Sequence, residues 1–320
     1  MKKILLVCAL AVMVNACKTN VDTTSLDPKD YTVTTQEIED IVTFLASDDL
    51  KGRNTGTEGI GEAANYVESK FNAYGIKPFF DTYRDNFKVG DLDAYNVVGY
   101  LEGNDATLKN EFIVIGAHYD HIGQSKTVAN DSIANGANDN AAGTSGVLAL
   151  AKYFGAKKTN KRSLLFVTFS AEEKGLLGSA HLAKRLKQEN FNMYTMINLE
   201  MIGVPFKDRD YIAFVTGFDK SNIAQKINEY SGTKVVGYSE VAAKYNLFRQ
   251  SDNYAFYKEF NLPCHTISSC DLSNYDYYHH VDDEADKLDY NHMVQLINSI
   301  IPGIEKMSNT PTKEITLNEN

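Results

Sequence analysis

The sequence predicts an α/β fold of three layers, in which a largely parallel mixed sheet is covered by helices on both faces. Two observations lead to this prediction. Short apolar runs of strand length alternate with longer segments of helical periodicity along most of the chain. The run Leu164–Phe169 is apolar except for Thr168, which is typical of a strand that is buried on both faces.

The individual elements follow from apolar spacing and from the residues that start or end helices. Helices are expected at Gln36–Leu45, Ile60–Tyr74, Ala142–Phe154, Leu176–Leu186, Ser221–Tyr230 and Tyr290–Ile304. Strands are expected at Tyr95–Tyr100, Phe112–Gly116, Leu164–Phe169, Met193–Leu199, Tyr211–Val215 and Pro263–Ile267. Ligand sites of such sheets form on the loops beyond the carboxyl ends of the strands, so functional residues should be sought there.

Composition limits the class of protein. The chain has 320 residues, of which 43% are hydrophobic, and this supports a packed core and argues against disorder. The formal net charge of −10 argues against binding to nucleic acid through its phosphates. The acidic excess is consistent with a soluble surface or with carboxylates gathered around a cation, and composition alone does not separate the two.

The first residues predict export. Lys2 and Lys3 precede the uncharged apolar run Ile4–Val14, which is too short for a good membrane span. The sequence Val14-Asn15-Ala16-Cys17 resembles a bacterial lipoprotein cleavage site, with lipid on Cys17, although an ordinary signal peptide would also fit. We therefore expect an exported protein that is lipid-anchored to the bacterial cell envelope. The expected organisation is a signal peptide at 1–16, a polar tether at 17–33, a single folded domain at 34–309 and a polar tail at 310–320.

Two cysteines remain in the expected domain. Cys264 and Cys270 are six positions apart, and in an oxidising compartment we expect them to form a disulfide. Two buried thiols are the alternative. A zinc site on these cysteines would need a second close pair, which the chain lacks.

Five short segments carry residues that could do chemistry, and most of them follow an expected strand. His118 and Asp120 are two apart and share a face of extended chain, where the acid could orient a ligating histidine or simply form a structural pair with it. Asp139 stands among small residues ahead of a helix, as an N-cap or as a carboxylate shared by two metals.

The other three segments are similar in character. Glu172 and Glu173 follow an apolar strand, where they could complement a helix dipole or divide metal binding and proton transfer between them. Glu200 ends a strand, and His279 lies in an aromatic, polar loop. Each segment alone has an ordinary structural explanation, and it is their order and placement that point to a site.

In that order and placement the chain resembles the zinc aminopeptidases of metallopeptidase family twenty-eight. This family also contains glutamate-carboxypeptidase-type enzymes and glutaminyl cyclases. The resemblance runs from about Leu45 to Tyr290 and includes the motifs Leu45-Ala-Ser-Asp-Asp-Leu-Lys-Gly-Arg53 and His279-x-x-x-Asp283-x-x-Asp286-Lys287. It implies a zinc-peptidase fold and two zinc ions in each chain.

The resemblance also implies roles for individual residues. His118 binds one zinc, and Asp139 bridges both. Glu173 and His279 bind the other zinc, while Glu172 is the general base. Asp120 orients His118. By analogy, the peptide bond between Asp139 and Asn140 is expected to be cis.

Glu200 is the main departure from the family pattern. It occupies the position of the last ligand of the first zinc, where most members have Asp. Glu is longer by one methylene, although a carboxylate of either length suits zinc. The departure puts the occupancy of the first zinc site in question.

Two further residues have open roles. Tyr278 precedes His279, at a position where a tyrosine in some family members donates a hydrogen bond to the oxyanion, and aromatic packing is the alternative. Asp252 could line the pocket or hold a substrate amine, and a helix N-cap at Ser251 is the alternative. The remaining histidines match no ligand position and are expected to be surface or hydrogen-bonded residues: His121, His181, His265, His280 and His292.

The expected function is a zinc-dependent exopeptidase that removes N-terminal residues from peptide substrates. Two metal ions would activate water and Glu172 would transfer its proton. Glutaminyl cyclase-like or carboxypeptidase activity on the same scaffold remains an alternative. A binding lipoprotein without catalysis is a further alternative, which the presence of Glu172 and Asp139 disfavours.

Overall fold

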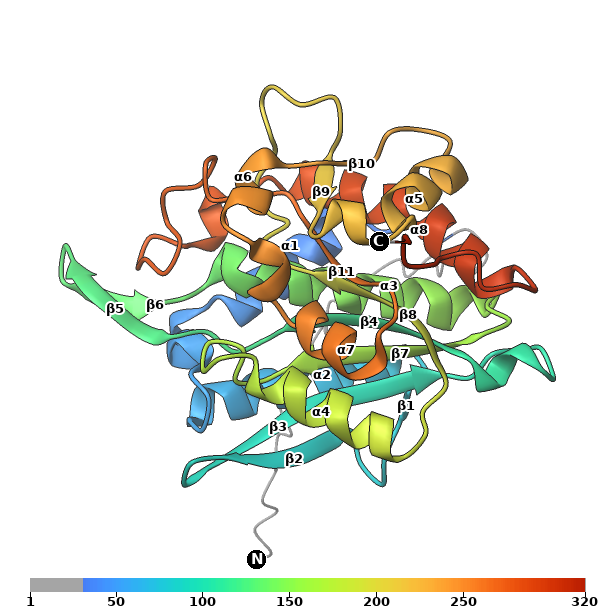
Figure 1. Cartoon of the computed structure of the whole chain (residues 1–320). Helices are drawn as coiled ribbons and strands as arrows, with labels where there is room; N and C mark the ends of the chain where they lie inside the picture. The colour runs from blue at the N-terminus through green and yellow to red at the C-terminus, as the bar shows by residue number, and fades with distance from the viewer. Residues whose placement is uncertain (1–30, 320) are drawn as a thin grey trace, which may run out of the picture.

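The computed structural model describes residues 31–319 and shows the three expected layers (Figure 1). A large mixed sheet crosses the molecule, with helices on both faces. The expected signal peptide, the lipid-bearing Cys17 and most of the expected tether lie outside the described residues. Within residues 31–319, no helix combines the length and the apolar character needed to cross a membrane.

The main sheet of the described chain has nine strands in the order β1-β3-β7-β4-β8-β11-β9-β10, and β2 pairs with β3 outside this path. The strands are β1 Lys77–Pro78, β2 Arg84–Val89, β3 Leu92–Leu101, β4 Phe112–His118, β7 Ser163–Phe169, β8 Met193–Leu199, β9 Ala213–Val215, β10 Val236–Gly237 and β11 Cys264–Ser268. At the centre β7, β4, β8 and β11 are parallel, whereas β3 and β9 run antiparallel to their neighbours in this set. The loops that follow the four parallel strands therefore meet at one edge.

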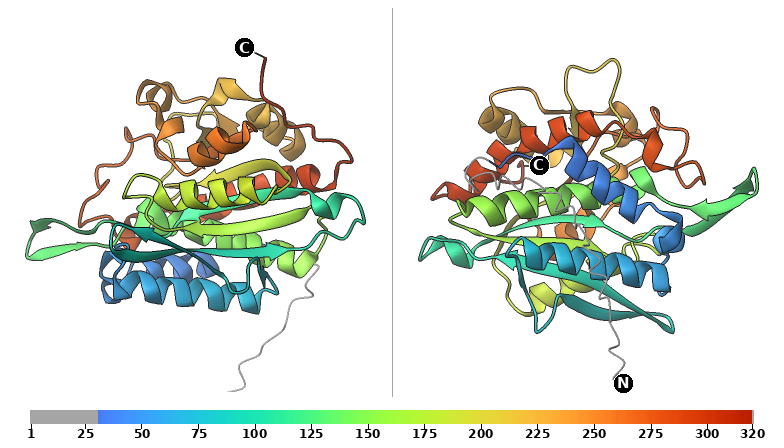
Figure 2. Two further views of the ribbon diagram at one scale, coloured as in Figure 1. Left: turned by 60° about the horizontal axis from the view of Figure 1, so that its bottom comes forward. Right: turned by 180° about the vertical axis from the view of Figure 1, so that it is seen from behind.

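The helices are divided between the two faces of the sheet. They are α1 Thr35–Leu45, α2 Glu58–Ala73, α3 Gly143–Lys157, α4 Leu177–Gln188, α5 Ile223–Ser231, α6 Glu240–Lys244, α7 Asn253–Phe260 and α8 Tyr290–Asn309. Buried side chains of α1, α2, α3, α5 and α8 form one apolar cluster, and those of α4 and α7 form another. Figure 2 (right) shows α1, α2, α3 and α8 together behind the sheet as it is seen in Figure 1.

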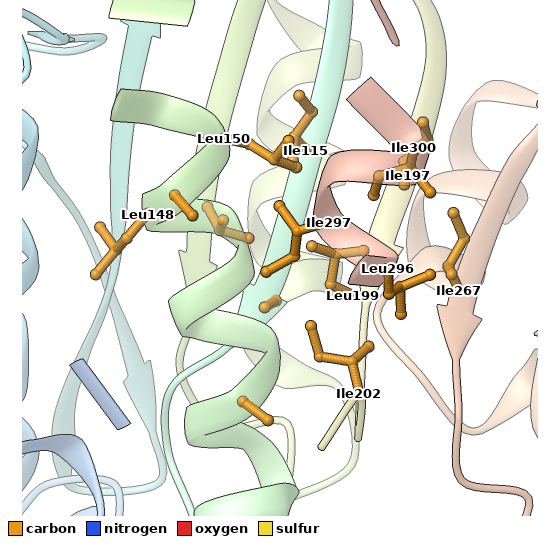
Figure 3. Packing of buried hydrophobic residues seen from close by; sticks show 14 of the residues in the cluster. Ile115, Leu148, Leu150, Ile197, Leu199, Ile202, Ile267, Leu296, Ile297 and Ile300 are labelled. Carbon is orange, nitrogen blue, oxygen red and sulfur yellow. The ribbon is translucent and has the colours of Figure 1, made fainter. Parts of the chain in front are cut away.

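The central strands are buried on both faces because successive side chains point to opposite clusters. On β4, Ile113 and Ile115 pack in the larger cluster and Val114 packs in the smaller one. Figure 3 shows the larger cluster at the point where α3 and α8 meet the strands, and Leu150, Ile115 and Ile297 belong to it. This packing fixes the strand ends that carry the site.

The expected helices and strands are present, with ends that differ by a few residues. Thr34 caps α1, since its hydroxyl accepts a hydrogen bond from the Glu37 amide. The sequence did not predict the polar strand β2, the short helix α6 or helix α7. It also missed the hairpin of β5 Gly123–Val128 and β6 Asp131–Ala134, which projects from the body (Figures 1 and 2).

The chain after α8 packs on the domain, unlike the polar tail expected at 310–320. Ile315 is buried, and its amide donates to the Tyr194 hydroxyl at 2.8 Å. Leu317 forms an isolated bridge with Ser221. This segment therefore belongs to the folded domain as far as residue 319.

The disulfide expected between Cys264 and Cys270 is wrong, because both thiols are free and buried. Cys264 opens β11 and packs in the cluster under α4 and α7, whereas Cys270 lies past the end of β11 and packs in the opposite cluster. At about 3.3 Å per residue, the four steps from Cys264 to the end of β11 at Ser268 span roughly 13 Å. A disulfide tolerates a Cα separation of no more than about 7 Å.

Candidate metal centre

Acidic and histidine side chains meet at the edge of the sheet where β4, β7 and β8 end. Two groups of ligand atoms could each hold a cation, and the atoms of each group lie within 4.8 Å of one another. The first group is His118, Glu172 and Glu200, and the second is His121, Asp139 and Glu173. All of the metal ligands expected from the sequence lie in or against these groups, together with one histidine that was not expected.

His118 is the last residue of β4 and is buried. Its Nε2 lies 3.3 Å from Asp139 Oδ1, and its Nδ1 lies 3.1 Å from the backbone carbonyl of Asp120. Because a carbonyl oxygen only accepts, Nδ1 carries the proton and Nε2 is left free to bind a metal. Asp120 thus orients His118 as expected, but through its carbonyl, since the nearest carboxylate contact is 3.8 Å.

The Asp120 carboxylate holds the loop that carries the two glutamates. It accepts hydrogen bonds from the amides of Glu172 at 3.1 Å and Glu173 at 3.4 Å, and from the Thr55 hydroxyl at 3.2 Å. Burial raises the pKa of Asp120 to about 6, although the neighbouring His118 opposes this. A single residue therefore fixes the end of β4 relative to the end of β7.

Asp139 lies in the tight turn Ala137–Ala142, which joins β6 to α3. The peptide bond between Asp139 and Asn140 is cis, as expected. Asp283 holds this turn: its carboxylate accepts from the amides of Asn138 at 2.7 Å and Asp139 at 3.0 Å, and from the Tyr275 hydroxyl at 2.6 Å. Burial alone would raise the pKa of Asp139, but His118 and His279 outweigh it and hold the pKa well below its usual range.

Asn140 connects the Asp139 turn to the end of β8. Its side-chain amide donates to the carbonyl of Leu199 at 3.0 Å, and its side-chain oxygen accepts from the amides of Met201 at 3.1 Å and Gly143 at 2.9 Å. Leu199 and Met201 flank Glu200. The backbone on both sides of Glu200 is therefore anchored to the turn that carries Asp139.

Three acids share the first group or lie beside it: Glu172 and Glu200 are partly buried and Asp252 is fully buried. Burial raises the pKa of Glu172 well above its usual range, and the carboxylates of Glu200 and Asp252 add to this rise. Burial also raises the pKa of Glu200 to about 8, while the Ser251 hydroxyl, which donates to Glu200, partly opposes it. Such crowding of carboxylates disfavours their charged forms unless a cation lies among them.

His279 approaches the second group from the loop after β11. Its Nε2 lies 3.0 Å from Glu173 Oε2 and 3.4 Å from Asp139 Oδ2, so the structure brings these three expected ligands together. The Ser125 hydroxyl of the projecting hairpin donates to the His279 carbonyl at 2.7 Å. The Tyr278 ring stacks on the His279 ring with a centroid distance of 3.9 Å.

His121 is the functional candidate that the sequence prediction missed. It was expected to be a surface or hydrogen-bonded histidine, but it is fully buried and its Nδ1 lies 3.0 Å from Glu173 Oε1. The available signal was its place three residues after His118, on a loop that follows a buried strand. Of the other histidines, His265 bonds Ser221 at 2.7 Å and His280 accepts from the Asp282 amide at 3.0 Å, as expected.

Asp252, and not Ser251 as expected, stands at the start of α7. It is the N-cap residue of α7, but its side chain forms no capping hydrogen bond, and both carboxylate oxygens are buried without a hydrogen-bond partner among the described residues. Burial raises its pKa to about 7. Ser251, its neighbour, is the residue that reaches Glu200 and the adjoining cavity.

The unpaired atoms of the site fit a bound cation. Nε2 of His118, Nδ1 of His121, Nε2 of His279 and Oε1 of Glu173 are buried and form no hydrogen bond within residues 31–319. Buried polar atoms normally find partners, because an unsatisfied one costs about 1–3 kcal/mol. Imidazole nitrogens and carboxylate oxygens are the donor set that zinc accepts. The residues present therefore suit zinc.

A cavity opens beside the first group. Glu200, Ser251 and Tyr278 form its side toward the metal centre. Its other lining residues are mostly apolar or hydroxyl-bearing: Met201, Phe214, Thr216, Leu247, Gln250, Thr266, Ser268, Cys270 and Leu272. The cavity can therefore receive part of a ligand whose reacting group lies against the centre.

Comparison with known families decides the classification. The model of Peptidase family M28 matches residues 96–302, which is more than half of the chain and spans β3 to α8. The chain belongs to peptidase family M28. This membership confirms the resemblance to metallopeptidases, and the matched residues include both groups of the metal centre.

Relatives of this M28 chain carry peptidase names. A probable leucine aminopeptidase of Trichophyton verrucosum is 27% identical over 270 residues, which are 80% of this chain and 66% of that protein. A probable zinc metalloprotease of Pyrenophora tritici-repentis is 28% identical over 177 residues, which are 52% of this chain and 40% of that protein. The M28 chain thus spans between two fifths and two thirds of the length of these curated relatives.

Solved structures share the fold. A zinc aminopeptidase from Bacillus subtilis matches with a TM-score of 0.69 at 15% identity, over 90% of this chain and 98% of the other. A glutaminyl cyclase from Bacteroides thetaiotaomicron matches with a TM-score of 0.66 at 16% identity, over 88% of this chain and 99% of the other. The expected fold class is confirmed by these matches.

Proposed function

We propose that this M28 chain is a zinc-dependent aminopeptidase that hydrolyses the N-terminal residue from peptides. One zinc would be held by His118, Asp139 and Glu200, and the other by Asp139, Glu173 and His279. Asp139 is placed to serve both, because its Oδ1 faces His118 at 3.3 Å and its Oδ2 faces His279 at 3.4 Å. Family membership and this arrangement of ligand atoms support the proposal.

When bound, zinc ions polarise a carbonyl and make water a better nucleophile near neutral pH. Glu172 is the group that would take the proton of the attacking water and pass it to the departing amine. It lies three residues after the end of β7 and belongs to the first group. Tyr278 lines the cavity, and its hydroxyl is the group that we propose to donate a hydrogen bond to the developing oxyanion.

The distribution of charge favours an aminopeptidase over a carboxypeptidase. Acids crowd the centre, and no lysine or arginine is among the residues that line the cavity. The zinc ions would offset the charge of the acids that hold them, so the contrast lies in the cavity wall, which offers a terminal carboxylate of the substrate no cationic side chain. This contrast is the observation that carries the aminopeptidase proposal.

The cavity also favours apolar substrate side chains. Met201, Phe214, Leu247 and Leu272 offer apolar contacts, and Glu200 would repel an acidic side chain. The substrate class that we propose is therefore a peptide with a free N-terminal amine and an apolar first residue.

A panel of peptides tests this function. Purified protein with measured zinc content should release leucine from a free Leu-peptide and should not cut the N-acetylated peptide at a comparable rate. Equal rates on free and blocked peptides would exclude an aminopeptidase. A Gln-peptide belongs in the panel, because a glutaminyl cyclase shares this fold and cyclisation is the second candidate reaction. Loss of ammonia without release of free glutamine would establish it.

Replacement of the proposed base should separate metal binding from catalysis. Glu172→Gln keeps the shape of the side chain but cannot accept the proton, so kcat should fall by at least 100-fold. Zinc content should stay close to that of the unaltered protein. Glu39→Gln, on the exposed surface of α1, is the matched control and should leave both unchanged. An active Glu172→Gln variant would show that another group is the base.

We further propose that the protein is exported and anchored by lipid on Cys17. The charged start, the apolar run and the cysteine at positions 2–17 support this. Labelled palmitate should be incorporated by the full chain and not by Cys17→Ser, and the unaltered protein should pellet with membranes. Release of the unaltered chain in soluble form would contradict the anchor.

A further inference from the structure

We propose that His121 is an additional ligand of the second cation, so that Asp139, Glu173, His279 and His121 together hold it. This inference rests on the proposed function, since it adds a ligand to the same centre. It goes beyond the ligand set implied by the sequence, in which His121 had no role. The consequence is that the two cation sites differ in their number of protein ligands, with four at the second site and three at the first.

The His121 ring is held in one place. Its side chain is fully buried, and a Cβ added to Gly136 would lie 2.5 Å from its Cγ, so the ring packs directly on the Gly136 backbone. The His121 amide donates to the carbonyl of Arg53 at 3.3 Å. The Arg53 guanidinium in turn donates to the carbonyls of Tyr119 at 2.8 Å and Gly136 at 2.9 Å. The backbone on both sides of the ring is therefore fixed.

The distances around His121 resemble those around His279. Nδ1 of His121 lies 3.0 Å from Glu173 Oε1 and 3.8 Å from Asp139 Oδ2. Nε2 of His279 lies 3.0 Å from Glu173 Oε2 and 3.4 Å from Asp139 Oδ2. Ligands that are about 2.0–2.1 Å from a tetrahedral zinc lie roughly 3.3 Å from one another. Both imidazoles thus stand at ligand distance from the same two carboxylates.

The orientation of the two rings agrees with a shared cation. Their centroids are 5.6 Å apart and their planes are inclined by 72°. Two imidazoles that bind one zinc through nitrogens at about 2.0–2.1 Å place their ring centres roughly 5–6 Å apart. The rings approach edge to face across Glu173 and do not stack on each other.

The contact between His121 and Glu173 is close but does not have the direction of a hydrogen bond. Both ring nitrogens of His121 and the Nε2 atoms of His118 and His279 have no hydrogen-bond partner in the described chain. Carboxylate oxygens nevertheless lie 3.0–3.3 Å from His121 Nδ1, His118 Nε2 and His279 Nε2. A nitrogen that binds a cation points at the cation and not at its fellow ligands. His121 Nδ1 shares this property with the two histidines that the family resemblance implies as ligands.

Four protein ligands would close the second site. Structural zinc sites are typically four-coordinate and fully supplied by the protein, whereas catalytic zinc sites have three protein ligands and one open position. The first site, with His118, Asp139 and Glu200, would keep the open position. We therefore expect the second cation to bind more tightly and first, and the first cation to bind more weakly.

Metal titration of the full-length chain tests this inference. Protein stripped with a chelator is titrated with Co²⁺, whose absorption reports its ligands, and the zinc-loaded form at one equivalent is studied by X-ray absorption. The unaltered chain should bind in a tight and a weak phase, with two imidazoles on the tightly held ion. His121→Asn and His121→Phe should weaken the tight phase by at least 100-fold and remove one imidazole. Glu200→Gln should weaken only the other phase.

Two features of the design separate a ligand from a residue that only supports Glu173. The amide of Asn can still donate a hydrogen bond to Glu173 from this position, so a supporting role would leave His121→Asn with nearly unchanged affinity. His280→Gln, a histidine on the same loop as His279, is the control and should change neither phase. If Phe at 121 prevents folding, the Asn variant, checked by circular dichroism, carries the test.

The remaining outcomes are also decisive. A single imidazole on the tight ion of the unaltered chain, unchanged affinity in both variants, or equal weakening of both phases would overturn the role of His121. In those cases the proposed function would stand, because the unaltered chain still binds metal. If the unaltered chain takes up no divalent ion, the proposed function itself fails.

Discussion

Arg53 is a buried cation that holds the loops of the metal centre from behind. Its guanidinium donates to the carbonyls of Tyr119, Asn135 and Gly136, and also to that of Leu45. No carboxylate of the described chain forms an ion pair with it, yet Asp283, Asp120 and Asp139 are near enough to oppose the fall in its pKa, which burial lowers to about 10. Arg53 therefore has two effects: it holds the backbone of these loops through hydrogen bonds, and it places a positive charge near the acids of the metal centre.

Changes at Arg53 should show both contributions. Arg53→Met leaves buried carbonyls without donors and removes the charge, so the free energy of unfolding should fall by about 3–5 kcal/mol. Arg53→Lys keeps the charge but not the planar fork, and it should be intermediate. Urea unfolding measures this, with the exposed Arg249→Lys as the control. Equal losses in the Lys and Met variants would show that only the hydrogen-bond geometry matters.

His265 should make the stability of the protein depend on pH. It lies on β11, and its ring bonds the Ser221 hydroxyl and the Thr216 carbonyl, each at 2.7 Å. Burial lowers its pKa from 6.5 to about 4. Between these values the unfolded chain binds a proton that the folded chain does not, so stability falls as the pH falls from 6.5 to 4.

The expected contribution is about 3 kcal/mol, from about 1.4 kcal/mol for each pKa unit. His265→Gln cannot titrate, so its unfolding free energy should lie below that of the unaltered protein at pH 8 and approach or pass it near pH 4. Urea unfolding of the metal-free forms at several pH values measures the difference. A constant difference between pH 8 and pH 4 would contradict this account.

At the scale of elements, Gly143 of α3 and Gly303 of α8 differ in how much space surrounds them. An added Cβ on Gly143, at the start of α3, would lie 2.3 Å from the Leu199 carbonyl and 2.4 Å from Asn140 Oδ1. These are the atoms that anchor the Asp139 turn to the end of β8. In α8, an added Cβ on Gly303 would meet its nearest neighbour, Ile227, at 3.7 Å, which is ordinary contact.

The same substitution should therefore have opposite effects at the two sites. Gly143→Ala should destabilise the fold by about 1–3 kcal/mol through overpacking, and it should weaken zinc binding because the turn shifts. Gly303→Ala should stabilise by up to about 1 kcal/mol, because alanine favours helix. Denaturant unfolding and metal titration of both variants check this pair. A Gly143→Ala variant with normal zinc affinity would show that the turn is not rigidly coupled to α3.

Elements also show which local predictions succeed. The run Leu164–Phe169 was predicted to be a strand because nearly every residue is apolar, and β7 is buried throughout. The strand β2, Arg84–Val89, was missed because its sequence is polar and it pairs only with β3. The extended conformation of β2 is thus stabilised by its pairing with β3 and is not encoded by an alternation of apolar and polar residues in its own sequence.

For the whole molecule, removal of metal should lower thermal stability. Without cations, the carboxylates of the two groups are buried together at high cost. Ligand binding at 100 times its dissociation constant adds about 2.7 kcal/mol, which corresponds to a shift in Tm of roughly 4–5 °C for a domain of this size. Calorimetry with and without a chelator measures the shift. Asp139→Asn is the control and should show little response, whereas an equal response in that variant would place the bound metal elsewhere.

The sequence by itself determined the order of the central strands and of the long helices, and the segments that hold the site. His118, Glu173, Glu200 and the segment of His279 were found because each lies beside an expected strand end or in a recognisable motif. This succeeded because apolar periodicity is local, and parallel strands bring their carboxyl ends to one edge.

The tertiary structure alone decided how those side chains relate to one another. It separated Cys264 from Cys270 across the sheet and placed the His121 ring beside Glu173. It also brought the Asp120 carboxylate to the backbone amides of Glu172 and Glu173. Each of these depends on where two distant segments come to lie, and local spacing carries no information on that distance. Sequence patterns specify which face a residue shares with its near neighbours, whereas packing decides which distant residue it meets.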